Sequence, residues 1–265
     1  MKSALFLPIF DELSDPRVVA SLAADAEEAG WHGVFVWDHI GYREPVRAIA
    51  DPWVTMSAIA VATSTLLIGP MITPLPRRRP VVVSRQVASL DQLCDGRLIL
   101  GVGIGSDGAG ELTATGEELD DRTRGAMLDE GLAILRAAWT GEPVNHAGEH
   151  YTVNDLAVLP TPVQPAGPPV WIAARYGNRK PLRRAAQHDG FFPIDITSPD
   201  QLAEVVATVA ELRGGLDGYD VAIGGRDPGP YAAVGATWWC ASFSPYDLKL
   251  DEVRGVLRDG PYSSG

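Results

Sequence analysis

The stretch that decides the fold runs from Leu66 to Gly105: LLIGPMITPLPRRRPVVVSRQVASLDQLCDGRLILGVGIG. Two short apolar runs near its ends, Leu66–Gly69 and Leu98–Val102, predict buried strands. Between them, Pro80 opens a segment with the apolar spacing of an amphipathic helix, at Val83, Val87, Leu90 and Cys94. The stretch is therefore one strand–helix–strand unit, and in parallel α/β proteins ligands bind where such strands end.

The same alternation of a short apolar strand with a helix recurs along the chain. The eight predicted strands are Ala4–Leu7, Gly33–Val36, Leu66–Gly69, Leu98–Val102, Val170–Ala174, Gly190–Ile194, Asp220–Gly224 and Thr237–Ala241. They predict an α/β fold, a (β/α)8 TIM barrel that spans residues 1–265 as a single domain, with an open doubly wound sheet as the alternative. We expect a long loop after strand four (103–121), an excursion before strand five (141–169) and a shortened helix seven (225–235).

Composition excludes several classes of function. Hydrophobic residues make up 46% of the chain, yet no apolar run approaches the length of a bilayer span, so we expect no membrane association. The net charge of −12 argues against nucleic acid as a partner. The N-terminal residues are typical of a first buried strand, not of a signal peptide. Only two cysteines are present, which favours a reducing, cytoplasmic location.

Two literal motif matches are better explained by local structure. Gly103–Gly108 has the spacing of a dinucleotide-binding loop, but it follows the fourth strand and leads into a polar segment with no apolar helical stripe. Glycines there can let the backbone approach a ligand or relieve crowding between strands. His146–His150 matches a zinc-protease motif that requires a helix, which Pro143 and Gly148 oppose. Its alternating pattern predicts a hairpin, so we predict no metal site.

One histidine has a position suited to catalysis. His39 ends the tripeptide Trp-Asp-His that directly follows the second predicted strand, where it could exchange a proton near neutral pH or simply hydrogen-bond to the backbone. Arg77 and Arg78 follow the third strand, where they could bind an anionic ligand at the mouth of the barrel or form a solvated turn, and we expect the solvated turn. The sequence has no nucleophile elbow, P-loop or close pair of carboxylates. Such a site suits a cofactor that carries the chemistry.

Six segments in order and at the right spacing resemble the luciferase-like monooxygenase family: Val34–Ile40, Asp51–Ala60, Leu66–Gly105, Leu128–Gly131, Gly148–Tyr151 and Ala236–Trp239. The resemblance implies an oxidoreductase that transfers a hydride between coenzyme F420 or FMN and a small organic substrate. Coenzyme F420 is favoured because His39 lies within Trp-Asp-His after strand two. The alternatives are an FMN-dependent monooxygenase that activates O2 and a non-catalytic flavin-binding barrel. Relatives are commonly dimers, which implies a homodimer here.

The resemblance also implies roles for individual residues. His39 matches the histidine that helps proton transfer near the reactive ring, with Asp38 beside it. A non-proline cis peptide that supports the ring is expected at Met71–Ile72, next to Thr73. The phosphate and tail of the cofactor map to the loops after strands four and five, at Gly105, Ser106, Arg175, Gly177 and Asn178. Many relatives have a further glycine where this chain has Arg175 and Tyr176.

Overall fold

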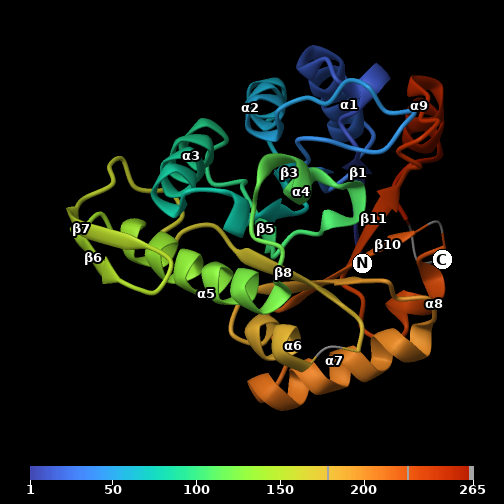
Figure 1. Ribbon diagram of the computed structural model, residues 1–265. Helices are drawn as coiled ribbons and strands as arrows, with labels where there is room; N and C mark the ends of the chain where they lie inside the picture. The colour runs from blue at the N-terminus through green and yellow to red at the C-terminus, as the bar shows by residue number, and fades with distance from the viewer. Residues whose placement is uncertain (178, 226, 263–265) are drawn as a thin grey trace.

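Parallel strands alternate with helices throughout the computed structural model, which describes residues 1–177, 179–225 and 227–262 (Figure 1). Within these residues the main sheet contains β1 (Lys2–Leu7), β2 (Gly33–Val36), β3 (Leu67–Pro70), β4 (Thr73–Pro74), β5 (Leu100–Gly103), β8 (Val170–Arg175), β9 (Gly190–Ile194), β10 (Asp220–Gly225) and β11 (Trp238–Ser242). Every predicted strand is confirmed to within two residues at either end. Their near-continuous apolar sequences fit burial on both faces.

The sheet closes where its third strand is interrupted. Its order is β3-β2-β1-β11-β10-β9-β8-β5-β4, so the two ends of the sheet are successive parts of one strand, separated by Met71 and Ile72. β4 pairs with β5 through Thr73 opposite Val102 and Pro74 opposite Gly103. An isolated bridge from Ile68 to Leu98 joins β3 to the segment before β5. The (β/α)8 barrel is confirmed, and the open sheet is excluded.

The helices cover the outside of this barrel (Figure 1). They are α1 (Pro16–Glu28), α2 (Pro52–Ala62), α3 (Pro80–Leu93), α5 (Asp121–Ala138), α6 (Arg179–Ala185), α7 (Pro199–Arg213), α8 (Gly229–Ala232) and α9 (Leu250–Asp259). Proline in the first turn and a side-chain cap at Asp15, Asp51 or Ser198 start three of them. The four-residue α8 confirms the shortened helix seven. None of the helices in the described ranges is long and apolar enough to span a membrane.

The excursion before β8 forms an antiparallel hairpin of β6 (Val144–Ala147) and β7 (Thr152–Leu156). Glu130 of α5 holds its turn: the carboxylate lies 3.2 Å from His146 Nε2 and accepts hydrogen bonds from the backbone N–H groups of residues 149–151. The predicted hairpin is therefore confirmed. In the part of the chain that the structure describes, no cluster of side chains is arranged to hold a metal ion.

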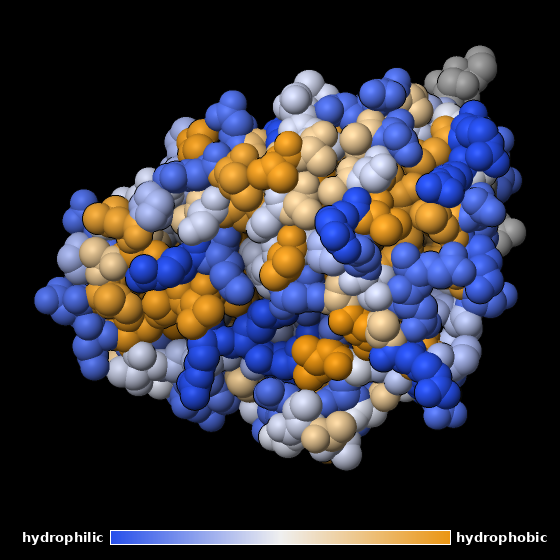
Figure 2. Space-filling view, turned by 90° about the horizontal axis from the view of Figure 1, so that it is seen from above, coloured by the Kyte–Doolittle hydropathy of each residue, from blue (hydrophilic) through white to orange (hydrophobic). Residues whose placement is uncertain are grey.

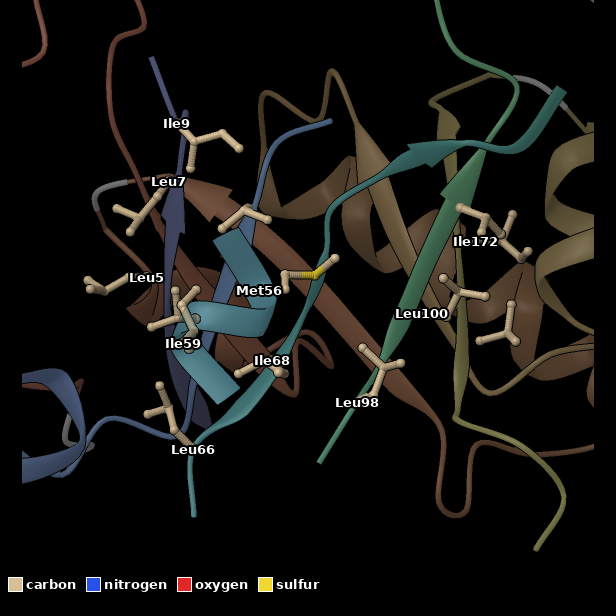
Figure 3. Packing of buried hydrophobic residues seen from close by; sticks show 14 of the residues in the cluster. Leu5, Leu7, Ile9, Met56, Ile59, Leu66, Ile68, Leu98, Leu100 and Ile172 are labelled. Carbon is tan, nitrogen blue, oxygen red and sulfur yellow. The ribbon is translucent and has the colours of Figure 1, made fainter. Parts of the chain in front are cut away.

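Apolar side chains fill two layers, one between the strands and the helices and one inside the barrel. Figure 3 shows the first: Met56 and Ile59 of α2 lie against Leu5 and Leu7 of β1 and Ile68 of β3, all fully buried. Inside the barrel the ring centroid of Trp171 lies 5.3 Å from that of Phe35 and 5.4 Å from that of Trp238. These rings fill the barrel interior, as packed side chains do in TIM barrels.

Two glycines of the opening stretch allow β3 and β5 to approach each other. A Cβ atom on Gly69 would lie 2.0 Å from the carbonyl oxygen of Ile99, and one on Gly101 would lie 2.3 Å from that of Pro70. Only glycine leaves room for backbones this close. At these two positions the glycines relieve crowding between strands and do not receive a ligand.

Candidate active site

A cavity of about 1450 Å³ opens at the carboxyl ends of the barrel strands. It is lined by seven of the residues predicted for the site: Asp38, His39, Met71, Ile72, Gly105, Ser106 and Arg175. Thr73 is fully buried beneath it, and Gly177 is not part of its lining. Asn178 lies outside the described residues. The structure thus gathers most of the predicted site around one opening, where ligands bind in TIM barrels.

His39 is held from one side by a buried carboxylate. Its Nδ1 lies 3.0 Å from Oε1 of Glu111, and its side chain is 26% exposed. An ionised carboxylate only accepts hydrogen bonds, so Nδ1 carries the proton in this pair. Among the described residues no hydrogen-bonding group contacts Nε2. The second ring nitrogen is therefore free to exchange a proton with a ligand.

Glu111 is the site residue that the sequence did not reveal. It begins the one-turn helix α4 (Glu111–Thr115) in the loop after β5, and its side chain is only 2% exposed. Oε2 accepts the N–H of Ile40 at 3.0 Å and lies 2.9 Å from Nη1 of Arg77. Burial raises the pKa of Glu111, but the hydrogen bonds from His39 and Ile40 and the charge of Arg77 outweigh it. The pKa lies below its usual value, so the carboxylate is ionised near neutral pH.

Beneath His39, Asp38 joins two arginines in a buried ion network, defined here as Asp38, Arg77, Arg78 and Glu111. Oδ1 of Asp38 lies 2.7 Å from Arg77 Nη2 and 2.8 Å from Arg78 Nη2. Oδ2 accepts the hydroxyl of Thr73 at 2.8 Å. The expectation of a solvated turn at Arg77 and Arg78 is wrong: the Arg77 side chain is 4% exposed. Two buried carboxylates require cations beside them, which draws these guanidinium groups inward.

The interruption of the third strand supplies the apolar floor of the cavity. The peptide bond between Met71 and Ile72 is cis, which confirms the position predicted for it. Both residues line the cavity. The side chain of Ile72 lies over Gly103, where a Cβ atom would be 2.9 Å from Ile72 Cδ1. The floor therefore extends from the interruption to the end of β5.

Exposed charges line another part of the cavity, and five of them are here called the charged rim: Arg122, Arg175, Arg179, Lys180 and Asp195. Nη1 of Arg175 lies 3.0 Å from Oδ2 of Asp195, and both side chains are mostly exposed. Nearby, Gly105 adopts a positive φ of 77° and Ser106 Oγ accepts the N–H of Gly108 at 3.2 Å. Two further exposed carboxylates in the lining, Asp121 and Asp129, pair with Arg124 and Arg184. Four of the five rim charges are cationic, so the rim favours an anionic group.

The sequence of this chain was compared with models of known protein families. Residues 1–226 match the model of the luciferase-like monooxygenase family. The chain belongs to this family. The match includes seven of the eight barrel positions, all except β11. It also includes the cavity-lining residues His39, Met71, Ser106 and Glu111.

Among curated members, an F420-dependent glucose-6-phosphate dehydrogenase from Amycolatopsis mediterranei is 35% identical over 164 residues, which are 60% of this chain and 48% of the relative. An F420-dependent hydroxymycolic acid dehydrogenase from Mycobacterium tuberculosis is 32% identical over 166 residues, 62% of this chain and 45% of the relative. The matched part of the chain spans about half the length of these relatives.

A similar fold occurs in a solved F420-dependent secondary alcohol dehydrogenase in complex with an F420–acetone adduct. It superimposes with a TM-score of 0.73 at 24% identity, over 84% of this chain and 68% of that one. At this identity the likeness shows a common fold. It agrees with the closed barrel described above.

Proposed function

We propose that this chain is an oxidoreductase that transfers a hydride between coenzyme F420 and a small organic substrate. The observation that carries the proposal is His39, which lines the cavity while its Nδ1 is held at 3.0 Å by the buried Glu111 carboxylate. The names of the two relatives, both F420-dependent dehydrogenases, support the choice of coenzyme.

The residues of the cavity fit a flavin-type coenzyme. A flat ring requires apolar surface, which Met71 and Ile72 supply beside His39. An anionic tail requires cations and backbone donors, which the charged rim and the loop at Gly105 and Ser106 supply. At about 1450 Å³ the cavity exceeds the roughly 300–1,000 Å³ of ordinary small-molecule sites. It has room for a coenzyme and a substrate together.

Residues of the chain would transfer the hydroxyl proton of the substrate. When bound, the coenzyme supplies a ring carbon that accepts or releases the hydride. In alcohol oxidation His39 Nε2 takes the hydroxyl proton, and in the reverse direction it returns that proton. Glu111 keeps the proton on Nδ1 and stabilises the imidazolium that forms. Asp38 acts at a distance: it fixes Arg77, which in turn fixes Glu111.

Equilibrium titration with coenzyme F420 and with FMN tests the proposal. We expect F420 to bind at micromolar concentration and FMN to bind more weakly. Binding of FMN alone, with oxygen consumed by the reduced complex, would instead establish the FMN-dependent monooxygenase. Binding without turnover of any alcohol or carbonyl compound would favour the non-catalytic barrel.

A matched pair of variants separates the role of His39 from general stability. His39→Ala should leave coenzyme binding intact and lower the hydride-transfer rate about 10²–10⁴-fold, the usual contribution of a positioned acid or base. His146→Ala is the control, because His146 pairs with Glu130 at 3.2 Å outside the cavity. Equal activity in the two variants would remove His39 from the mechanism.

The proposal also includes three properties of the whole molecule. Residues 1–265 form a single domain, two copies of the chain form a homodimer, and the protein is cytoplasmic. Both cysteines are buried and unbonded, which suits a reducing compartment.

Helix α2 is apolar on all sides, with Val54 and Val61 exposed on its outer face, and such helices are normally covered. Figure 2, viewed from the side where α1, α2 and α3 lie in Figure 1, shows apolar patches among hydrophilic residues. Val61→Glu should shift the mass measured by light scattering toward a monomer.

A further inference from the structure

The part of the cavity around His39 differs chemically from the charged rim. Aromatic rings from β1, β9 and the segments after β2 and β11 line it, and we call them the aromatic wall: Phe6, Trp37, Tyr42, Phe192 and Tyr246. The wall and the rim belong to one cavity, and β9 contributes to both, through Phe192 and the adjoining Asp195. The other wall residues come from β1 and the segments after β2 and β11, and the other rim residues from α5, β8 and α6. A molecule bound at His39 therefore meets mostly ring surface.

The rings of the wall form a continuous surface. Tyr42 lies edge-on to His39 with centroids 5.0 Å apart, and Tyr246 lies 5.9 Å from Tyr42. On the other side Trp37 lies 5.7 Å from His39 and 5.5 Å from Phe6. Ring centroids at 4.5–7 Å are in favourable contact, and a further ring placed among them gains the same contacts.

The cations beneath His39 are already neutralised. The guanidinium groups of Arg77 and Arg78 are both held by Asp38, and Arg77 also pairs with Glu111. Arg43, next to Tyr42 in the sequence, donates to the carbonyl oxygen of Gly108, which orders its guanidinium group without cancelling its charge. The nearest ionised group that touches His39 is the carboxylate of Glu111, which repels a phosphoryl group.

We propose, on the basis of the function proposed above, that the substrate is an uncharged secondary alcohol or ketone that carries an apolar, ring-sized group. That group would pack against the aromatic wall, with Tyr42 and Tyr246 as specificity-determining residues. A sugar phosphate is the less suitable ligand for this part of the cavity. The charged rim would remain available for the anionic tail of the coenzyme.

The reaction balances with the coenzyme alone. The alcohol loses its hydroxyl proton to His39 Nε2 and the hydride on its carbinol carbon to the oxidised coenzyme. The C–O single bond becomes a carbonyl, so the substrate loses two electrons and the coenzyme gains two. No further oxidant is needed, and the reverse reaction reduces a ketone.

For ketones, the test measures binding in a complex that cannot react. Oxidised coenzyme and a ketone both lack the transferable hydride, so acetophenone and acetone can each be titrated into the F420-saturated protein. Glucose 6-phosphate carries a hydride on its anomeric carbon, so its titration is followed both for binding and for reduction of the coenzyme, and reduction would count against the proposal. Burial of a phenyl group should make acetophenone bind at least about tenfold more tightly than acetone. Glucose 6-phosphate should bind more weakly than acetophenone.

Variants locate the preference. Tyr246 is 43% exposed, so its truncation leaves the core intact. Tyr246→Ala should weaken acetophenone binding about five- to tenfold and leave acetone within about twofold, as expected for the loss of ring contacts. Tyr246→Phe should restore it. Tyr176→Ala is the matched control, because the Tyr176 hydroxyl donates to Glu204 outside the cavity, and it should not change the ratio of the two ketones.

The outcomes separate the two proposals. If F420 binds but glucose 6-phosphate binds more tightly than acetophenone, the substrate class is wrong and the coenzyme assignment stands. An unchanged affinity for acetophenone in Tyr246→Ala also overturns the role of the aromatic wall. If the protein does not bind F420, the proposed function fails, and the inference fails with it.

Discussion

The buried ion network and the charged rim use similar side chains in opposite ways. In the network, Asp38 and Glu111 share Arg77 at 2.7 and 2.9 Å with almost no exposure to solvent. In the rim, Arg175 and Asp195 pair at 3.0 Å but both are mostly exposed. Interactions in the interior are screened less than those at the surface. The network therefore fixes the position of His39, while the rim supplies charge without rigidity.

The largest effect should follow from breaking the network at its centre. Asp38→Asn removes the carboxylate partner of Arg78 and leaves Arg77 with Glu111 alone, and breaking a buried ion pair in this way typically costs about 3–5 kcal/mol. Urea unfolding should show this as a lower free energy of unfolding at neutral pH. A loss below about 1 kcal/mol, the value typical of surface pairs, would mean that the network behaves like the rim.

A second buried group lies on the α6 side of the barrel, at His188. Burial, followed by the charge of Arg136, lowers its pKa from 6.5 to about 4. The unfolded chain thus binds this proton more readily than the folded chain between these pH values. Stability should therefore fall as pH drops from 6.5 to 4, by up to about 3 kcal/mol at 1.4 kcal/mol per pKa unit.

Comparison with His188→Gln checks this assignment. The variant lacks the titrating imidazole, so its free energy of unfolding should change less over the same pH range. Parallel pH profiles for the two proteins would assign the acid sensitivity to other groups. The measurement shows whether solvent is excluded from the surroundings of His188 as it is from the buried ion network.

A smaller effect is expected at Glu111. Glu111→Gln keeps the shape and an acceptor oxygen but removes the charge beside Arg77, which should cost about 1–3 kcal/mol. Because the folded-state pKa lies below 4.5, the contribution of the carboxylate is complete above pH 4.5 and is lost as pH falls through the folded-state value. The variant should lose less stability than the parent protein below pH 4.5.

The smallest effect should come from the rim itself. Asp195→Asn removes the partner of Arg175 at the surface, where such pairs contribute about 0–1 kcal/mol. The free energy of unfolding should change by no more than this, and the change should disappear at high salt. A loss as large as that of Asp38→Asn would erase the distinction between the two regions.

The same distinction explains what the sequence could predict. The strands around Gly33–Val36 and Leu98–Val102 were predictable because apolar runs and turn residues act locally. His39 was predictable because it directly follows a strand. Family resemblance added the cis bond at Met71–Ile72, which no local pattern specifies.

The partners within the network were not predictable. Glu111 lies in a polar segment, and its burial depends on His39, which is 72 residues away in the chain. Arg77 and Arg78 have the composition of a surface turn, but Asp38, about 40 residues away, draws them inside. Pairing over such distances leaves no periodic signal, so charged residues without an apolar pattern were assigned to solvent.

The pairing of β4 with β5 closes the barrel, and it can be considered as an equilibrium between a paired and an unpaired state of these two strands. β4 and β5 are joined by two residue pairs, whereas β8 and β9 are joined by five. Strand pairs with few backbone hydrogen bonds part first. A ligand that contacts Ile72 and Gly103 contacts the residues on both sides of the β4–β5 pair, so it binds only when these strands are paired. Ligand binding and strand pairing are then linked equilibria. Slower amide exchange in β4 and β5 then reports ligand binding directly, before any turnover.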